Sequence, residues 1–377
     1  MKKIDLKNLS PEDLEKFVLK LGWKPYRAGQ IMSWLYHQGV IEIDSMTNLS
    51  FPLREELKKK ALVSFLRPSQ VLVSEDGTQK YLFPLEVGGV IESVLIPEKG
   101  HFTPLEKTSA EARGEIKDSC TFSHGVNATR ERLLTGFTLC ISTQLGCALK
   151  CRFCYTGTRG LIRNLTAAEI VGQVGAVLTH LGGKGDIKNI VLMGMGEPLN
   201  NYDNTLKALE IIFHPQGFAF SHRRVTLSSA GLIPELKRLG KESRVNLAIS
   251  LNAADYETRS FLMPINRKHP LKELIDVLGD YPLPHRKRIT FEYILIAGVN
   301  DALRDAEKLV DLLRPLRCKI NLIPFNEHPG GDFKRPAHGK IAVFRDFLVS
   351  HGYTTIVRES RGTDILAACG QLGGTHG

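Results

Sequence analysis

The sequence has no long hydrophobic run. None of its apolar stretches approaches the roughly 18 residues that indicate a membrane-spanning helix. The first residues, Met1 to Asp5, are basic and lead into charged residues rather than into the apolar segment of a secretory signal. Internal repeats, low-complexity tracts and coiled-coil patterns are also lacking. We therefore expect a monomeric, cytoplasmic protein that makes no membrane contact.

The cysteines do not form a disulfide framework. There are seven, an odd number, and three of them lie in one short cluster, which suits a reducing compartment where thiols do metal or redox work. With 42% hydrophobic and 24% charged residues, the composition is that of an ordinary folded protein. At 377 residues the chain fits one large domain with appendages.

Acidic residues are fewer than basic ones, which leaves a formal charge of +10 and a pI near 9.2. Such a balance favours a polyanionic partner, because Lys and Arg release counterions when they bind phosphates. Basic clusters occur at Lys150/Arg152, Arg159/Arg163, Arg223/Arg224 and 285–288. Each alone is most often a solvated surface. Several of them near the ends of strands would form a rim that binds RNA phosphates.

The period of the apolar residues divides the chain into five parts. We expect a helical module over 1–65 that binds RNA, a β-hairpin bridge over 66–98, a polar loop over 99–136, an α/β region over 137–350 and an extension over 351–377. In the α/β region the predicted strands are Thr138–Thr143, Asn189–Met193, Arg224–Leu227, Val245–Leu251, Thr290–Ile296 and Lys319–Ile323. Six strand–helix units are fewer than the eight of a closed barrel, so the count predicts a partial one.

The thiol cluster consists of Cys147, Cys151 and Cys154, spaced C-x3-C-x2-C. Three thiolates can hold three irons of a cubic iron–sulfur cluster and leave the fourth iron free for chemistry. A structural zinc site usually takes four ligands in paired C-x2-C spacing, and only one such pair is present. Zinc remains the alternative.

Several predicted strands end in polar residues. Gly196 and Glu197 follow one strand, where glycine allows close backbone approach and a carboxylate can bind an ammonium group. The other strand-end residues are Ser228, Ser250, Leu251, Asn252 and Asn326. Because the carboxyl ends of parallel strands meet at one edge of the sheet, these residues predict a shared binding site there.

The thiol spacing resembles that of the radical S-adenosylmethionine enzymes, and the resemblance extends from about Thr138 to Pro324. It implies a partial (β/α)6 TIM-like barrel and a [4Fe–4S] cluster held by Cys147, Cys151 and Cys154. It also implies S-adenosylmethionine bound through its amino group at Gly196 and Glu197. The carboxylate, ribose and adenine of the cofactor would lie at Ser228, Ser250, Leu251, Asn252 and Asn326.

Further motifs resemble the dual-specificity ribosomal and transfer RNA adenine carbon-2 methyltransferases. They are Gln144–Cys147, Gly157–Gly160 through Leu165, Met193–Tyr202 and the tail Arg361–Leu372. The resemblance covers nearly the whole chain except about 99–136. It implies 23S rRNA and some tRNAs as substrates, two S-adenosylmethionine molecules per turnover, and a reducing electron donor such as flavodoxin or ferredoxin.

The same resemblance implies three catalytic residues. Cys369, in the C-terminal catalytic tail, accepts a methyl group; Glu92 removes the carbon-2 proton; and Cys140 releases the product by forming a disulfide with Cys369. From the residues alone, Cys140 is more often a small buried hydrophobe, and a strand glutamate such as Glu92 usually faces solvent. Cys369 lies among small residues that could move a thiol into a cleft.

Two other functions remain open at this stage. A related family methylates carbon 8 of the same ribosomal adenine and shares the cluster and both extra cysteines. The tail and the Met193–Tyr202 stretch favour carbon 2. A protein of another class, an RNA-binding module stabilised by zinc and without catalysis, would also be basic and rich in thiols.

Overall fold

The computed structural model describes residues 3–98, 136–182 and 187–373. Its central feature is a 10-stranded sheet with the strand order β14-β13-β12-β11-β10-β9-β6-β5-β4-β3. The strands of this sheet are β3 (Gln70–Val73), β4 (Gln79–Pro84), β5 (Val90–Pro97), β6 (Phe137–Cys140), β9 (Ile187–Leu192), β10 (Val225–Ser229), β11 (Asn246–Ser250), β12 (Ile289–Leu295), β13 (Cys318–Pro324) and β14 (Thr355–Val357).

Short strands pair outside it: β1 (Ile4–Asp5) with β2 (Ala61–Leu62), and β7 (Gln144–Gly146) with β8 (Leu161–Asn164). The helices are α1 (Pro11–Lys20), α2 (Tyr26–Tyr36), α3 (Phe51–Lys60), α4 (Tyr155–Thr158), α5 (Ala167–His180), α6 (Tyr202–Phe213), α7 (Ile233–Glu242), α8 (Tyr256–Leu262), α9 (Leu271–Gly279), α10 (Leu303–Leu313) and α11 (His338–Ser350).

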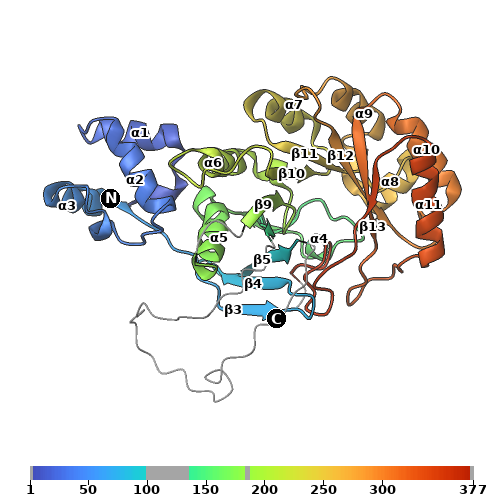
Figure 1. Ribbon diagram of the computed structural model, residues 1–377, viewed down its shortest axis with the longest axis horizontal. Helices are drawn as coiled ribbons and strands as arrows, with labels where there is room; N and C mark the ends of the chain where they lie inside the picture. Colours follow the sequence, from blue (N-terminus) through green and yellow to red (C-terminus); the bar gives the residue numbers. More distant parts are fainter. Residues whose placement is uncertain (1–2, 99–135, 183–186, 374–377) are drawn as a thin grey trace, which may run out of the picture.

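The six strands predicted for the α/β region all form, as β6 and β9 to β13, and each pairs in parallel with the next. Helices between them cover the sheet (Figure 1). Strands of this kind are buried on both faces, which explains why β12 is apolar along most of its length. The partial α/β barrel is therefore confirmed, and β14 extends it by one parallel strand that the sequence did not suggest.

The predicted hairpin continues the same sheet. β3, β4 and β5 are antiparallel to one another, and β5 pairs antiparallel with β6. In this register Lys80 lies opposite Val94, and Val94 lies opposite Cys140. Directly opposed residues point to the same face of a sheet, and so do residues two apart along a strand. Lys80, Glu92 and Cys140 therefore share one face.

The N-terminal helices form where the sequence predicts them. Ser10 caps α1 by accepting a hydrogen bond from the Asp13 N–H, and Pro11 begins the helix. The module is fixed to the α/β region by an ion pair between Asp13 and Lys207 of α6, at 2.7 Å. α1 to α3 lie together at one end of the molecule, beside α5 and α6 (Figure 1).

The predicted polar loop over 99–136, which includes Cys120, lies almost entirely outside the described residues. Within those residues, no helix is both long enough and apolar enough to cross a membrane. Cys318 is buried at the start of β13, as expected for a core residue.

Candidate active site

The three clustered thiols lie in the loop between β7 and α4. Cys147 N–H donates to the Gly160 carbonyl at 2.9 Å, and Cys154 N–H donates to the Cys151 carbonyl at 3.1 Å. Gly146 has a φ of +77°, and a Cβ there would lie 1.9 Å from the Gly160 oxygen. Only glycine fits this position, so the residue before Cys147 closes the loop tightly.

The environment of the thiols suits a metal cluster. Burial raises the pKa of all three, that of Cys147 to about 12, and neighbouring thiols raise the pKa of Cys147 and Cys151 further, so the thiols lie close together. Iron would displace these protons, as metals do when they bind cysteine. In the described part of the chain no three His, Cys, Asp or Glu side chains are grouped to hold a metal ion. In a cubic cluster, however, each thiolate binds a different iron.

Gly196 and Glu197 lie beside this loop. Gly196 has a φ of +97°, and a Cβ there would lie 2.4 Å from the Gln144 side chain. Glu197 accepts hydrogen bonds from the Leu199 N–H at 3.1 Å and the Ala230 N–H at 2.9 Å, and burial raises its pKa to about 7. The carboxyl group also raises the pKa of Cys147. An acceptor for an ammonium group is thus held next to the thiols.

The other predicted cofactor residues differ in whether their polar atoms already have hydrogen-bond partners within the protein. Ser228 and Ser250 hydroxyls lie 3.3 Å apart on adjacent strands. Asn326 donates to the Cys369 carbonyl at 3.0 Å, and its Oδ1, though buried, has no hydrogen-bond partner among the described residues. An unpartnered buried oxygen is costly unless a ligand satisfies it. The observation supports a bound group at this edge of the sheet.

The polar groups of Asn252 and Leu251 make hydrogen bonds within the protein. The Asn252 side chain accepts from the Ile294 N–H at 2.9 Å and donates to the Met263 sulfur at 3.3 Å. The Leu251 N–H donates to the Glu292 carbonyl. Asn252 has a φ of +60°, which asparagine tolerates better than most residues. The Leu251 side chain is fully buried in the hydrophobic core, so any contact of these two residues with a cofactor is left to the backbone of the turn.

The C-terminal tail returns across the thiol loop. Tyr155 N–H donates to the Gly370 carbonyl at 2.8 Å, and the Thr156 hydroxyl donates to the Leu372 carbonyl at 2.8 Å. Solvent reaches Cys369 even though surrounding protein raises its pKa to about 11. Cys369 in turn raises the pKa of the buried Cys140. Two free thiols that are far apart in the sequence therefore lie near each other.

Glu92 does not face solvent. Its side chain is 1% exposed and forms an ion pair with Lys80 at 3.7 Å. Its Oε2 has no hydrogen-bond partner among the described residues. The interpretation of Glu92 as an ordinary solvated strand residue is wrong, since the register turns it toward the face that also carries Cys140. The ion pair with Lys80 is made by this same Oε2 oxygen, and a buried carboxylate of this kind can accept a proton.

The sequence analysis missed three charged residues of this region, Lys80, Arg259 and Glu292. Arg259 is fully buried, donates to the carbonyls of Ala230 and Leu251, and lies close enough to Cys151 to lower the pKa of that thiol. Glu292 accepts from Asn321 at 2.8 Å and raises the pKa of Cys369. Lys80 and Glu292 each stand in a mostly apolar strand. A charged residue at such a position was the sequence feature that could have identified them.

The predicted phosphate-binding rim is wrong for two of its four clusters. Arg223/Arg224 and residues 285–288 immediately precede β10 and β12, so they lie at the amino ends of the strands, opposite the thiols. Lys150/Arg152 and Arg159/Arg163 do lie around the thiol loop. Of these, Arg152 stacks on the Phe261 ring at 4.3 Å, and Arg163 pairs with Glu169 at 2.6 Å.

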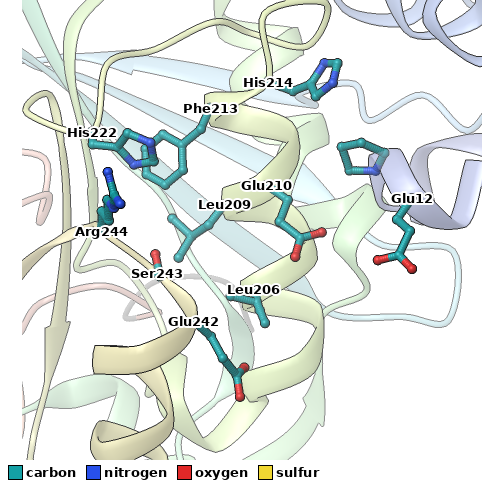
Figure 2. Close-up of a pocket in the computed structure, with 11 residues that line it drawn as sticks. Glu12, Leu206, Leu209, Glu210, Phe213, His214, His222, Glu242, Ser243 and Arg244 are labelled. Carbon is teal, nitrogen blue, oxygen red and sulfur yellow. The ribbon is translucent and has the colours of Figure 1, made fainter.

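A hollow of about 550 Å³ lies elsewhere, between α1, α6 and the end of α7 (Figure 2). Its lining includes Glu210, His214, His222 and Arg244, and burial lowers the pKa of both histidines. It contains no residue of the predicted site. The site at the thiols is therefore identified by its chemistry and not by the size of this hollow.

Comparison with known proteins agrees with this arrangement. Residues 4–63 match the ribosomal RNA large subunit methyltransferase N-terminal domain, and residues 141–313 match the radical SAM superfamily. A radical SAM methyltransferase of known structure from Sphaerobacter thermophilus is 39% identical, with a TM-score of 0.82, and the match covers 98% of this chain and 99% of that one.

Two curated relatives carry the same name, dual-specificity RNA methyltransferase RlmN. That of Syntrophotalea carbinolica is 48% identical over 99% of this chain and 90% of its own length. That of Geobacter sulfurreducens is 48% identical over 98% of this chain and 92% of its own length. At this identity and coverage, the chain belongs to the RlmN family of radical S-adenosylmethionine RNA methyltransferases.

Proposed function

We propose that this enzyme methylates carbon 2 of a specific adenine in 23S rRNA and of the adenine 3′ to the anticodon in some tRNAs. The observation that carries the proposal is the tail, which brings Cys369 next to Cys140 beside the thiol loop. Family membership and the charge of +10 support an RNA substrate. The relatives are named dual-specificity RNA methyltransferases, and residues 4–63 match a ribosomal RNA methyltransferase domain, which supports more than one RNA substrate with rRNA among them.

Carbon 2 of adenine is an electron-poor ring carbon without a lone pair, so it cannot attack a sulfonium methyl group directly. Cys369 would instead accept a methyl group first, through its thiolate sulfur. When bound, the [4Fe–4S] cluster and a second S-adenosylmethionine supply a 5′-deoxyadenosyl radical that takes a hydrogen atom from this methyl group. The resulting carbon radical would then form a carbon–carbon bond that joins Cys369 to the base, and the radical adduct would give up one electron, which the cluster could take back when it is bound.

Two residues would complete the reaction. The Glu92 carboxylate would take the proton from carbon 2. The Cys140 thiolate would then attack the sulfur of Cys369, which forms the disulfide and breaks the sulfur–carbon bond. The carbon keeps the electron pair and takes up a proton to become the methyl group of the released base. Both residues face the same side of the sheet, near the tail, which supports the assignment. The disulfide must be reduced before the next turnover.

The remaining roles follow the chemistry of the side chains. Cys147, Cys151 and Cys154 would hold the cluster, and Glu197 with Gly196 would bind the amino group of S-adenosylmethionine. Ser228, Ser250 and Asn326 would bind its carboxylate, ribose and adenine, together with the turn at Leu251 and Asn252. The module at 1–65 would bind RNA. A flavodoxin or ferredoxin would supply the electron to a monomeric enzyme.

The test is mass spectrometry of nucleosides from 23S rRNA and tRNA of a strain that lacks this adenine methylation, with and without the protein. We expect 2-methyladenosine with the wild type and none with Cys369→Ala, which should keep its iron–sulfur absorbance. Appearance of 8-methyladenosine would move the protein to the carbon-8 reaction, and full activity of the variant would overturn the methyl relay.

A further inference from the structure

Lys80 is an unusual residue for its position. It lies in the interior of β4, and its side chain is 1% exposed. A lysine is almost never fully buried unless it is paired, because removing an ammonium group from water costs several kcal/mol. Its partner is Glu92 on β5, whose carboxylate lies 3.7 Å away and is equally buried.

The same ammonium group contacts the tail. Lys80 Nζ donates a hydrogen bond to the carbonyl of Leu366 at 3.3 Å. Leu366 lies three residues before Cys369 and has a φ of +51°, so its carbonyl is set by a sharp turn in the backbone. One side chain therefore links Glu92 to the segment that carries Cys369.

The tail is also docked by contacts that do not involve Lys80. Asp364 accepts from the Ser74 hydroxyl at 2.6 Å and from the Glu75 N–H at 3.2 Å. Asp76 accepts from the Gly362 N–H at 2.9 Å. These contacts come from the turn between β3 and β4. They offer a matched control, since breaking them loosens the tail without touching the ion pair.

We propose that Lys80 is a positioning residue, which pairs with the Glu92 carboxylate and fixes it relative to the docked tail and Cys369. The inference rests on the proposed roles of Glu92 and Cys369. Removing one partner of a buried ion pair leaves the other uncompensated, so without Lys80 the Glu92 carboxylate loses the group that holds it in place. Among the described groups, Glu92 is the charge that acts on Lys80, and the thiol of Cys140 shares the same face of the sheet.

The role predicts a defect at one step. Methyl transfer to Cys369 does not use Glu92, whereas loss of the carbon-2 proton does. Without Lys80 the enzyme should still methylate Cys369 and still join the RNA, but it should release the product slowly. The covalent protein–RNA adduct should therefore accumulate.

The experiment uses the full-length protein with its cluster, purified without oxygen, and an RNA oligonucleotide with the target adenine. We would compare wild type, Lys80→Met, Lys80→Gln, Lys80→Arg and Asp364→Asn. Four quantities are measured: iron content, Cys369 methylation by peptide mass, adduct on a denaturing gel, and 2-methyladenosine. Lys80→Gln keeps a donor for the Leu366 carbonyl and removes the charge. It therefore tests the proposal even if Lys80→Met does not fold.

We expect Lys80→Met and Lys80→Gln to lose about 10- to 100-fold in 2-methyladenosine formation at pH 7, with normal iron and Cys369 methylation. Both should accumulate adduct. Lys80→Arg should restore most of the activity, and Asp364→Asn should lower Cys369 methylation without accumulation of adduct. Loss of product without adduct in the Lys80 variants would overturn the proposal. A wild type that methylates neither Cys369 nor RNA would refute the proposed function instead.

Discussion

The two ends of the parallel strands differ in how their polar groups are satisfied. At the carboxyl ends, the groups are buried and partly without hydrogen-bond partners, as Asn326 Oδ1 is among the described residues. At the amino ends, the groups are cationic and mostly exposed, as Arg223 and Arg224 are. An unsatisfied buried atom indicates a ligand or a reaction, whereas a solvated cation indicates at most a surface for association.

The cations at the amino ends repel one another. Burial, Arg223 and Lys319 together lower the pKa of Lys287, and Arg244 and Lys287 lower the pKa of His222. A phosphate could relieve this repulsion, but the target adenine has to reach the opposite end of the strands. The carboxyl ends therefore carry the chemistry, whereas the amino ends offer at most a general attraction for RNA, and four substitutions can test that separation.

The largest effect is expected at the thiol loop. Cys151→Ala should remove a cluster ligand and abolish both iron–sulfur absorbance and RNA methylation, since each thiolate holds one iron. The matched control is Cys318→Ala, which changes a buried cysteine at the amino end of β13. Iron content and 2-methyladenosine are measured for both. A variant of Cys151 that keeps its cluster, or a control that loses it, would contradict the assignment.

A smaller effect should distinguish the two basic surfaces. Arg159→Ala, beside the thiol loop, should raise KM for RNA about fivefold and weaken the salt dependence of binding, because it removes one phosphate contact close to the target base. Arg223→Ala, before β10, should change KM by less than about twofold. Binding is measured against salt concentration and kcat in parallel. Equal losses in both variants would mean that RNA also wraps around the amino ends.

The fold could be predicted from the sequence where structure follows local pattern. The strands β6 and β9 to β13 were found because each is a buried apolar run followed by a helical one. β14 was missed because Thr355–Val357 is short and only partly buried. The pairing of β5 with β6 was missed because the pattern of apolar residues in a strand does not indicate which other strand it pairs with. Burial of Glu92 follows from that pairing.

The candidate site also divides into features that follow from local sequence and features that depend on long-range packing. The thiol spacing pointed to an iron–sulfur cluster directly, whereas the approach of Cys369 to Cys140 depends on long-range packing and entered only through family resemblance. The error on Arg223 and 285–288 was avoidable. A residue just before a parallel strand lies at the amino end, and that rule was available from the predicted strands alone.

The smallest effect concerns the ion pair between Asp13 and Lys207, which joins α1 to α6 away from both ends of the strands. Lys207 holds the pKa of Asp13 below its ordinary 3.8, so the stabilisation is fully present above that value and is lost only as the pH falls through the lower folded value. Because the pair is partly exposed, with side chains 39% and 35% accessible, it contributes about 0.5 kcal/mol. A double-mutant cycle with Asp13→Asn and Lys207→Met, followed by chemical unfolding between pH 5 and 8, should give this coupling at every pH. High salt should reduce it. A coupling that fades between pH 8 and 5 would show that another group sets the docking of the module, and Glu210, whose pKa Asp13 helps to raise, would be the next residue to substitute.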